Sequence, residues 1–373
     1  MQNFAVNLLI NMLEFYSPSG YESDLAKFLF KRMSLLGLKT HIDKVGNVIG
    51  EFGHGSPSIL LCGHMDTVSG KLPVVFKENI LYGRGAVDAK TSLAAMIVAA
   101  SILKNENFPG KVIVACVVDE EGEGTGIKQL IEAGVSADYA IFGEPSGVDN
   151  ITIAYKGSLH LKVLVRTATG HSSAPWLFDN AVEKAFDLAK LLSKINFLSE
   201  KKESRFYSIT SSLTKIIGGS SFSQVPSKCI FHIDFRVPPQ IAPSALYGEI
   251  KHVISEYAKK NSAITLQFKV LGVCEPYETD TNSLLIRSLS WAIRMVRGKP
   301  AIWVRKTGTS DLNLYGISVK VPIVAYGAGD SHLDHTSEER VDLKDYEDTI
   351  LVLCKGINRL MELHKRRKEK ELK

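Results

Sequence analysis

Five side chains that can bind a metal ion follow short apolar runs in this chain. The five are His64, Asp88, Glu121, Glu144 and His335, and the runs at 59–63, 112–118, 139–143 and 321–327 have the length of buried strands. In an open α/β sheet, the carboxyl ends of the strands form the crevice in which ligands bind. Nitrogen and oxygen ligands that converge at such an edge indicate a hydrolytic metal site, with room for one ion or for two.

Strand-like and helix-like patterns alternate over the first 153 residues. We expect strands near 38–51, 58–63, 112–118 and 139–143, and helices near 21–36, 88–104 and 126–133. This alternation is typical of βαβ units and of a mostly parallel sheet, so the fold class is α/β. The helix that begins at Asp88 is apolar nearly all round, and we therefore expect it to be buried.

A different pattern occupies residues 154–275. It reads as strand, helix, two strands, helix and strand, which is the order of a ferredoxin-like α+β unit. Helix and strand patterns resume from about residue 276, and 373 residues are enough for two domains of ordinary size. The simplest account is a catalytic domain of residues 1–153 and 276–373, interrupted by a smaller inserted domain at 154–275.

Cysteine usage and hydropathy argue against a disulfide-rich secreted protein and against a membrane-spanning one. The five cysteines are odd in number and scattered, which favours reduced thiols in a cytoplasmic protein over a disulfide framework. No apolar run approaches the roughly 20 residues needed to span a bilayer. The N-terminus lacks the basic leader and the small-residue cleavage site of a secretion signal.

Most of the net charge of +5 lies in the last nine residues, which carry six positive and two negative charges. A solvated helix end is one reading of this tail, and contact with an acidic macromolecule is the other. A nucleic-acid partner is disfavoured, because no aromatic side chains interleave with the basic cluster.

His64-Met65-Asp66 is the first motif that carries chemistry. Residues i and i+2 of a strand face the same way, so Asp66 could accept a hydrogen bond from the second ring nitrogen of His64 and fix its tautomer for metal binding. A solvated turn after a strand is the alternative. Asp88 can likewise be interpreted as the N-cap of the apolar helix or as a metal ligand. Both roles are compatible only if one carboxylate oxygen caps the helix and the other binds the metal ion.

Asp119-Glu120-Glu121 places three carboxylates at one strand end. Adjacent side chains point apart, so one Glu could bind a metal ion while its neighbour holds a water as general base. Solvated turn residues are the alternative reading. Glu144 and His335, each taken alone, are only weak evidence for a metal site. The chain lacks the P-loop pattern of nucleotide-binding proteins and the GxSxG pattern of serine hydrolases.

Taken together, these segments resemble the M20 family of dinuclear metallopeptidases and deacylases. The matching stretches are 63–68, 82–90, 119–122, 143–145 and 335–339, in the family's order and over nearly the whole chain. The resemblance implies a metal-dependent amide hydrolase with two divalent ions per chain. Zn²⁺ suits nitrogen and oxygen ligands of this kind well, and Co²⁺ and Mn²⁺ also fit them.

The resemblance also implies a role for each matched residue. Asp88 would bridge the two ions; one ion would be held by His64 and Glu144 and the other by Glu121 and His335. Glu120 would be the general base and Asp66 the residue that orients His64. The peptide bond between Asp88 and Ala89 would be cis, as it commonly is in the family.

The insert would be the family's lid and dimerisation domain. His171 would reach a neighbouring active site in a homodimer and stabilise the oxyanion there. Arg236, in the stretch Asp234-Phe235-Arg236, would hold a carboxylate of the substrate.

Within the family, the chain is most similar to hydrolases that release lysine or ornithine from the C-terminal glutamate of a small acidic amino-group carrier protein, in lysine and arginine biosynthesis. Stretches 72–74, 83–90, 143–147, 155–158, 306–311 and 326–331 carry this narrower likeness. Lys306 departs from the Gly-Gly-Thr pattern of other members, and together with Thr307 and Gly308 it is expected near the α-carboxylate of the released amino acid.

Two alternatives stay open at this point. The first is a small-molecule enzyme of the same class, acting on acetyl-lysine or acetyl-ornithine or as a dipeptidase. The second is a non-catalytic binding protein on the same fold, which the presence of all five ligands and of Glu120 disfavours.

Overall fold

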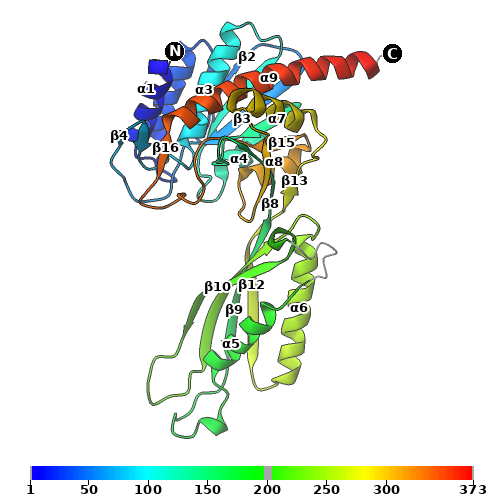
Figure 1. The fold of residues 1–373 in the computed structure, drawn as a ribbon. Coiled ribbons are helices and arrows are strands. Elements are labelled where there is room, and N and C mark those ends of the chain that lie inside the picture. The colour runs from blue at the N-terminus through cyan, green and yellow to red at the C-terminus, as the bar shows by residue number, and fades with distance from the viewer. Residues whose placement is uncertain (1, 197–203, 372–373) are drawn as a thin grey trace. The chain divides into compact units, whose positions relative to one another are not determined.

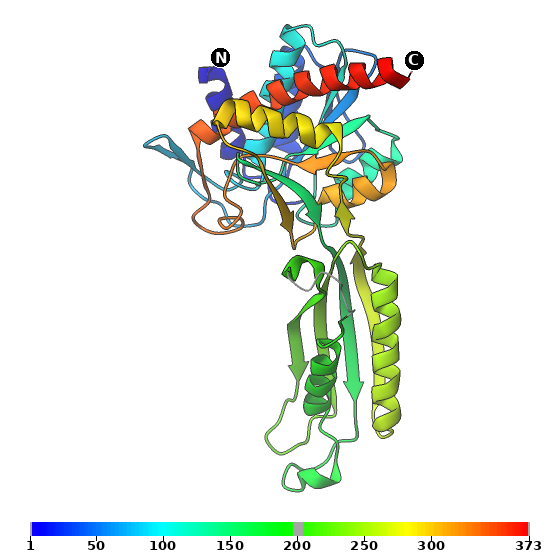
Figure 2. The same cartoon turned by 45° about the vertical axis from the view of Figure 1, so that its right-hand side comes forward.

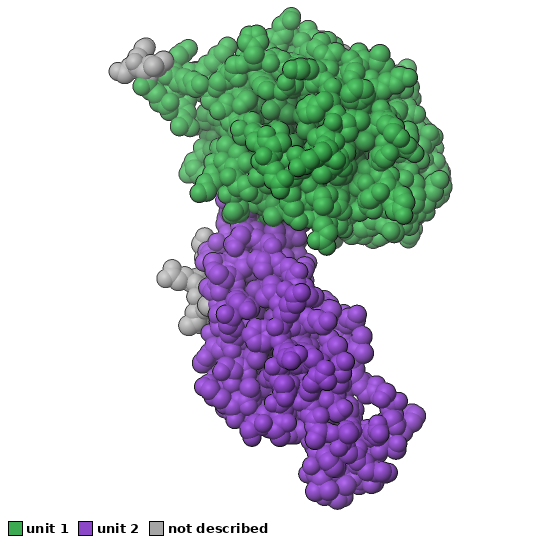
Figure 3. Space-filling model, turned by 180° about the vertical axis from the view of Figure 1, so that it is seen from behind, with its two compact units in different colours: residues 1–153, 279–305, 310–373 green, residues 154–278, 306–309 purple. Residues whose placement is uncertain are grey.

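The computed structural model describes residues 2–196 and 204–371, which form two compact units (Figure 3). Unit 1 comprises residues 1–153, 279–305 and 310–373, and unit 2 comprises residues 154–278 and 306–309. Among the residues described, no helix is both long enough and apolar enough to cross a membrane.

A nine-stranded sheet forms the centre of unit 1 (Figure 1). Its order is β1 (Lys39–Ile42), β2 (Val48–Phe52), β6 (Lys111–Val117), β3 (Ser58–His64), β7 (Tyr139–Phe142), β15 (Ile323–Ala325), β8 (Asn150–Tyr155) and β13 (Tyr277–Glu278), with β14 (Ile302–Lys306) also paired to β8. Strands β6, β3, β7 and β15 run parallel, and the flanking pairs are antiparallel.

The sheet is therefore mixed, whereas the sequence predicted a mostly parallel one. The single strand expected at 38–51 is a hairpin, because a tight turn interrupts it. The Asp43 carboxylate accepts hydrogen bonds from the backbone amides of Val45, Gly46 and Asn47, and thereby closes that turn. A connection this short can join only antiparallel strands.

Helices cover the sheet of unit 1, and α3 is the most deeply buried of them. The helices are α1 (Gln2–Glu14), α2 (Ser23–Leu35), α3 (Lys90–Asn105), α4 (Thr125–Glu132), α7 (Leu284–Arg297), α8 (Asp311–Val319) and α9 (Leu343–Glu371). Helices α1 and α9 pack against α3, α7 packs against α9, and α4 packs against α8. The burial expected of the helix after Asp88 is confirmed, since 13 of the 16 residues of α3 are buried.

A small sheet that was not predicted lies beside the main one. It joins β16 (Arg340–Asp342), β5 (Ile80–Tyr82) and β4 (Val75–Lys77). Because β16 pairs with β5, the segment that carries His335 lies next to the segment that leads to Asp88.

Unit 2 is a four-stranded antiparallel sheet with two helices. The strands are β9 (Gly157–Arg166), β10 (Thr210–Gly218), β11 (Lys228–Val237) and β12 (Thr265–Cys274), in the spatial order β10-β11-β9-β12. Helices α5 (Ala181–Leu192) and α6 (Pro243–Lys260) complete a β-α-β-β-α-β order, and short 3₁₀ turns lie at Pro175–Leu177 and Arg205–Tyr207. Apolar side chains of the two helices and of one face of the sheet form a core of their own.

Candidate metal centre

Two clusters of metal-capable side chains lie at the carboxyl ends of the parallel strands. One cluster is His64, Asp88 and Glu144, and the other is Asp88, Glu121 and His335. Within each cluster, one ligand atom from every residue lies within 4.8 Å of the others. Asp88 belongs to both clusters, so its carboxylate lies between the two potential ion positions.

The two oxygens of Asp88 face different histidines. Oδ1 lies 3.2 Å from Nε2 of His64, and Oδ2 lies 3.2 Å from Nε2 of His335. Helix α3 starts at Lys90 with Ala89 at its N-cap and no side-chain cap, so the reading of Asp88 as the helix N-cap is wrong. The Asp88–Ala89 peptide bond is cis.

The donor set is suited to divalent cations. Two imidazoles and three carboxylates, with no thiolate among them, are ligands that Zn²⁺, Co²⁺ and Mn²⁺ accept. The two carboxylates within each cluster repel one another unless a cation lies between them. Hydrogen bonds from His335 and His64 outweigh the effect of burial and lower the pKa of Asp88, which keeps the shared carboxylate ionised. The residues therefore fit a pair of divalent ions.

His64 is the last residue of β3, and its side chain is 2% exposed. Its Nδ1 lies 2.9 Å from the backbone oxygen of Asp66 and 3.5 Å from a carboxylate oxygen of the same residue. The nearer acceptor is therefore the carbonyl rather than the carboxylate that the sequence suggested. A proton on Nδ1 leaves Nε2 as the nitrogen that faces Asp88 and can bind a metal ion.

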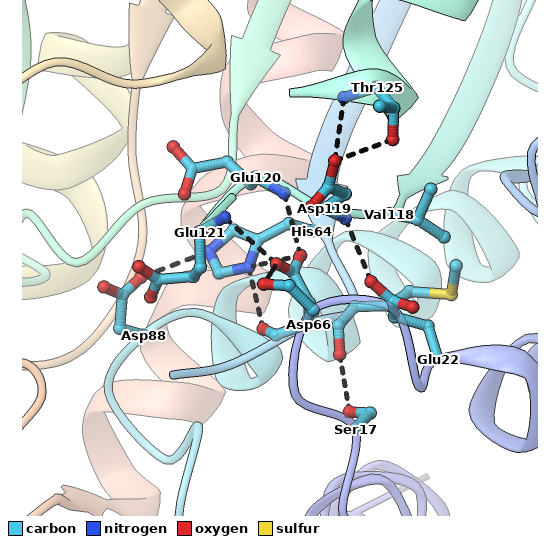
Figure 4. Close-up of polar contacts among 12 residues, drawn as sticks. Ser17, Glu22, His64, Asp66, Asp88, Val118, Asp119, Glu120, Glu121 and Thr125 are labelled. Atoms are coloured by element: carbon cyan, nitrogen blue, oxygen red, sulfur yellow. Dashed lines mark hydrogen bonds and ion pairs between the residues drawn. The ribbon is translucent and has the colours of Figure 1, made fainter. Parts of the chain in front are cut away.

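The carboxylate of Asp66 instead organises the turn that carries the acidic triplet (Figure 4). Oδ1 accepts a hydrogen bond from the amide of Glu120 at 3.1 Å, and Oδ2 accepts one from the amide of Glu121 at 3.0 Å. The Ser19 hydroxyl donates to Oδ2 at 2.7 Å. Asp66 is fully buried and fixes the backbone of both glutamates while it stays close to His64.

The loop between α1 and α2 supports this arrangement, which the sequence analysis did not foresee. The Ser17 hydroxyl donates to the backbone oxygen of Met65 at 2.8 Å. The buried carboxylate of Glu22 accepts a hydrogen bond from the amide of Asp119 at 3.1 Å. The only local signal is Ser-Pro-Ser-Gly between two helical patterns, which indicates a turn but not what the turn contacts.

Glu339 supports the segment that carries Asp88. The Glu339 carboxylate pairs with Arg84 at 3.0 Å, accepts a hydrogen bond from the amide of Gly85, and accepts another from the amide of His335 at 3.3 Å. Gly85 has a φ of +86°, and a Cβ there would lie 2.9 Å from the side chain of Lys90. Glu339 thus links the segments that carry Asp88 and His335.

Two further carboxyl groups beside the clusters have raised pKa values. Burial raises the pKa of Glu120 well above its usual range, and the charge of Glu144 adds to the rise. Asp311, at the first turn of α8, has one buried oxygen that finds no hydrogen-bond partner among the described residues, and burial raises its pKa to about 7. A carboxyl group poised in this way can take up a proton and pass it on near neutral pH.

The other predicted site residues belong to unit 2. His171 lies in an exposed loop, where its Nδ1 accepts a hydrogen bond from the amide of Ser173 at 3.1 Å. In the neutral ring the proton is then on Nε2, which can act as a donor. Arg236 pairs with Asp234 at 2.9 Å, and the backbone oxygen of Lys306 accepts a hydrogen bond from Lys156 at 3.1 Å. Thr307 and Gly308 follow Lys306 in the same unit.

Comparisons with known proteins agree on one family. The model of peptidase family M20/M25/M40 matches residues 60–359. A LysW-lysine/LysW-ornithine hydrolase of Sulfurisphaera tokodaii is 32% identical over 357 residues, which cover 95% of this chain and 94% of that protein. A protein of Pyrococcus abyssi that provisionally carries the same name is 34% identical over 355 residues, covering 95% and 94% of the two chains.

Solved structures share the fold at lower identity. The aminopeptidase PepT of Bacillus cereus superimposes with a TM-score of 0.82 at 21% identity, covering 97% of this chain and 99% of that one. A dinuclear metal-binding peptidase of the M20 family from Bacillus subtilis gives a TM-score of 0.74 at 15% identity, covering 97% and 98%. Both matches therefore extend over unit 1 and unit 2.

Proposed function

The chain belongs to peptidase family M20/M25/M40 and is a hydrolase of that family, and on this premise we propose that it releases lysine or ornithine from the C-terminal glutamate of an amino-group carrier protein. The substrate follows the relatives named LysW-lysine/LysW-ornithine hydrolase. The main observation in support of a metal-dependent hydrolysis is the pair of donor clusters that share Asp88. Glu120 precedes the ligand Glu121 in the chain. The reaction belongs to lysine and arginine biosynthesis.

His64, Asp88 and Glu144 would hold one divalent ion, and Asp88, Glu121 and His335 would hold the other. Zn²⁺ is the ion we expect, with Co²⁺ as a competent substitute. When bound, such ions act as Lewis acids on the scissile carbonyl and make the attacking water more acidic.

The side chains around the ions carry out the proton transfers. Glu120 accepts the proton of the attacking water and delivers it to the leaving amine, for which its raised pKa is suited. Asp66 holds the amides of Glu120 and Glu121, so the base and the ligand keep a fixed relation. Fixed positions of this kind lower the reorganisation needed during the reaction.

Unit 2 serves as the lid and dimerisation domain in this proposal. His171 of a neighbouring protomer donates from Nε2 to the oxyanion, an effect typically worth about 3 kcal/mol per donor. Arg236, together with Lys306, Thr307 and Gly308, binds the α-carboxylate of the released amino acid. All five cysteines are free, four of them buried, and this supports a cytoplasmic location.

Metal titration of the stripped enzyme with a lysine-carrier conjugate tests the proposal. Release of lysine should rise with added Zn²⁺ or Co²⁺ and saturate near two ions per chain. High activity on acetyl-lysine, acetyl-ornithine or dipeptides, with none on the conjugate, would replace the carrier by a small-molecule substrate. A protein that binds no metal ion would overturn the proposal as a whole.

A further inference from the structure

Both helices that the structure describes in unit 2 lie on one face of its sheet, and the other face carries neither of them. These are α5 and α6, and inward side chains of β9 and β11 join their core (Figures 1 and 2). Along β9 and β11 buried residues alternate with partly or fully exposed ones, as expected for a sheet with one solvated face. The solvated face therefore carries the residues between the buried ones, such as Lys162 on β9 and His232 on β11.

A row of four basic side chains crosses this open face. In the strand register, Lys215 of β10 lies opposite His232 of β11, His232 lies opposite Lys162 of β9, and Lys162 lies opposite Lys269 of β12. Directly opposed residues of antiparallel strands point to the same face, and like charges in such positions repel each other. We call Lys215, His232, Lys162 and Lys269 the basic row.

Within the part of the chain that the structure describes, no acidic side chain neutralises the lysines of the basic row. Lys162, Lys215 and Lys269 make no ion pair with any residue that the structure describes. Partial burial, followed by the charges of Lys215 and Lys162, lowers the pKa of His232.

The four strands contain only one acidic residue, Asp234. Asp234 is already engaged, with Arg236 at 2.9 Å and with His160 at 3.2 Å. Arg166 and Lys228 lie opposite each other on β9 and β11, and they extend the positive surface beyond the row. These positive side chains repel one another on one face of the sheet, and an anionic partner bound there would relieve that repulsion.

We propose that the basic row is the docking surface for an acidic carrier protein, whose modified C-terminus is the substrate. This inference rests on the proposed function and adds to it the place where the body of the carrier binds. Charge complementarity argues for this occupant, because opposed patches of this kind steer association and fix orientation.

The position of Arg236 supports the same occupant. Arg236 is on the same strand and the same face as His232, four residues further along, which is roughly 13 Å in an extended strand. A carrier bound on the row could therefore extend its C-terminal residues toward Arg236 without leaving this face.

Steady-state kinetics of a charge-removal variant test the proposal. In Lys162→Ala/Lys269→Ala, the KM for the lysine-carrier conjugate should rise about 10-fold or more at low salt, with kcat unchanged. The rise should shrink as salt is added, because salt screens exposed charges. A glutamyl-lysine conjugate of dipeptide size lacks the body of the carrier and should keep its kcat/KM.

A matched control comes from the helical side of unit 2. Lys190 on α5 and Lys260 on α6 are exposed, and Lys190→Ala/Lys260→Ala removes the same charge from the other side of the unit. This control should leave the KM for the conjugate unchanged. Removal of opposed like charges should also leave the row variant at least as stable as the parent in thermal unfolding.

The outcomes separate the two proposals. If neither the carrier conjugate nor glutamyl-lysine is hydrolysed, the proposed function fails and the docking surface fails with it. If the conjugate is hydrolysed but the row variant and the control have the same KM, the docking surface alone is wrong. Binding of an RNA or DNA oligonucleotide that depends on the row, without an effect on the conjugate, would also overturn it.

Discussion

Asp66 acts on the site through hydrogen bonds rather than by facing a substrate. Its carboxylate holds the amides of two successive glutamates, and its own backbone oxygen lies against His64. One residue thereby connects His64, at the end of β3, with Glu120 and Glu121, which follow β6. The roles of the ligands and of Glu120 remain predictions, and they are open to direct test.

Replacement of Glu120 separates the base from the ligands. Glu120→Gln should lower kcat by roughly 10²–10⁴-fold, because the general base is lost, while the metal content stays near that of the parent. Turnover assays and elemental analysis on the same preparation would measure both. Unimpaired activity in this variant would show that another group takes the proton.

Removal of the Ser19 hydroxyl tests the support of Asp66. Ser19→Ala should weaken metal affinity or activity by about 10–100-fold, the usual effect of a residue that orients a ligand. The free energy of unfolding should fall by only about 1 kcal/mol. Ser193→Ala is the control, because that hydroxyl makes a single exposed hydrogen bond to a backbone oxygen of unit 2. Equal effects in the two variants would argue against a positioning role for Ser19.

At the scale of elements, the end of β15 is packed against α3 and the Glu144 segment. Gly327 follows β15, and its amide donates a hydrogen bond to the Ser146 hydroxyl oxygen at 3.0 Å. A Cβ at Gly327 would collide with the Ser92 side chain and with the backbone oxygen of Glu144. Close approach of these elements, rather than a special backbone angle, requires glycine here.

Gly327→Ala should therefore destabilise the fold by about 1–3 kcal/mol through overpacking, and it should weaken the cluster that contains Glu144. Gly248→Ala in α6 is the matched control, since a Cβ there meets nothing within 4 Å. The control should stabilise the protein by about 0.5–1 kcal/mol, because alanine favours a helix interior. Denaturant unfolding of both variants measures the difference, and a neutral Gly327→Ala would contradict the packing argument.

At the scale of the whole molecule, the two units have separate cores, and both donor clusters belong to unit 1. Bound ions should therefore stabilise unit 1 in particular. At a free metal concentration about 100 times the dissociation constant, each site contributes roughly 2.7 kcal/mol.

Chelation should lower the unfolding temperature of unit 1 and leave that of unit 2 nearly unchanged. Calorimetry with and without a chelator would resolve the transitions, and readdition of Zn²⁺ should restore the first one. A shift of equal size in both transitions would mean that the units unfold together.

The sequence by itself determined the family, which the comparisons confirm, and the mixed α/β character of the fold in its coarse form. It could do so because strand runs, the apolar helix after Asp88 and the polar residue that ends each run are local patterns. The buried helix was predicted within two residues of its observed start. The hairpin at 39–52 was missed, because the turn is closed by one side chain inside a continuous strand-like run.

Only the tertiary structure decided which distant groups meet. Asp88 lies between His64 and His335, which are 24 and 247 residues away along the chain. The contacts of Asp66 with Ser19 and Glu120, and the alignment of Lys215, His232, Lys162 and Lys269, depend equally on strand order and register. Periodicity in a sequence specifies which face a side chain takes, whereas its neighbours on that face are set by packing between segments far apart in the chain.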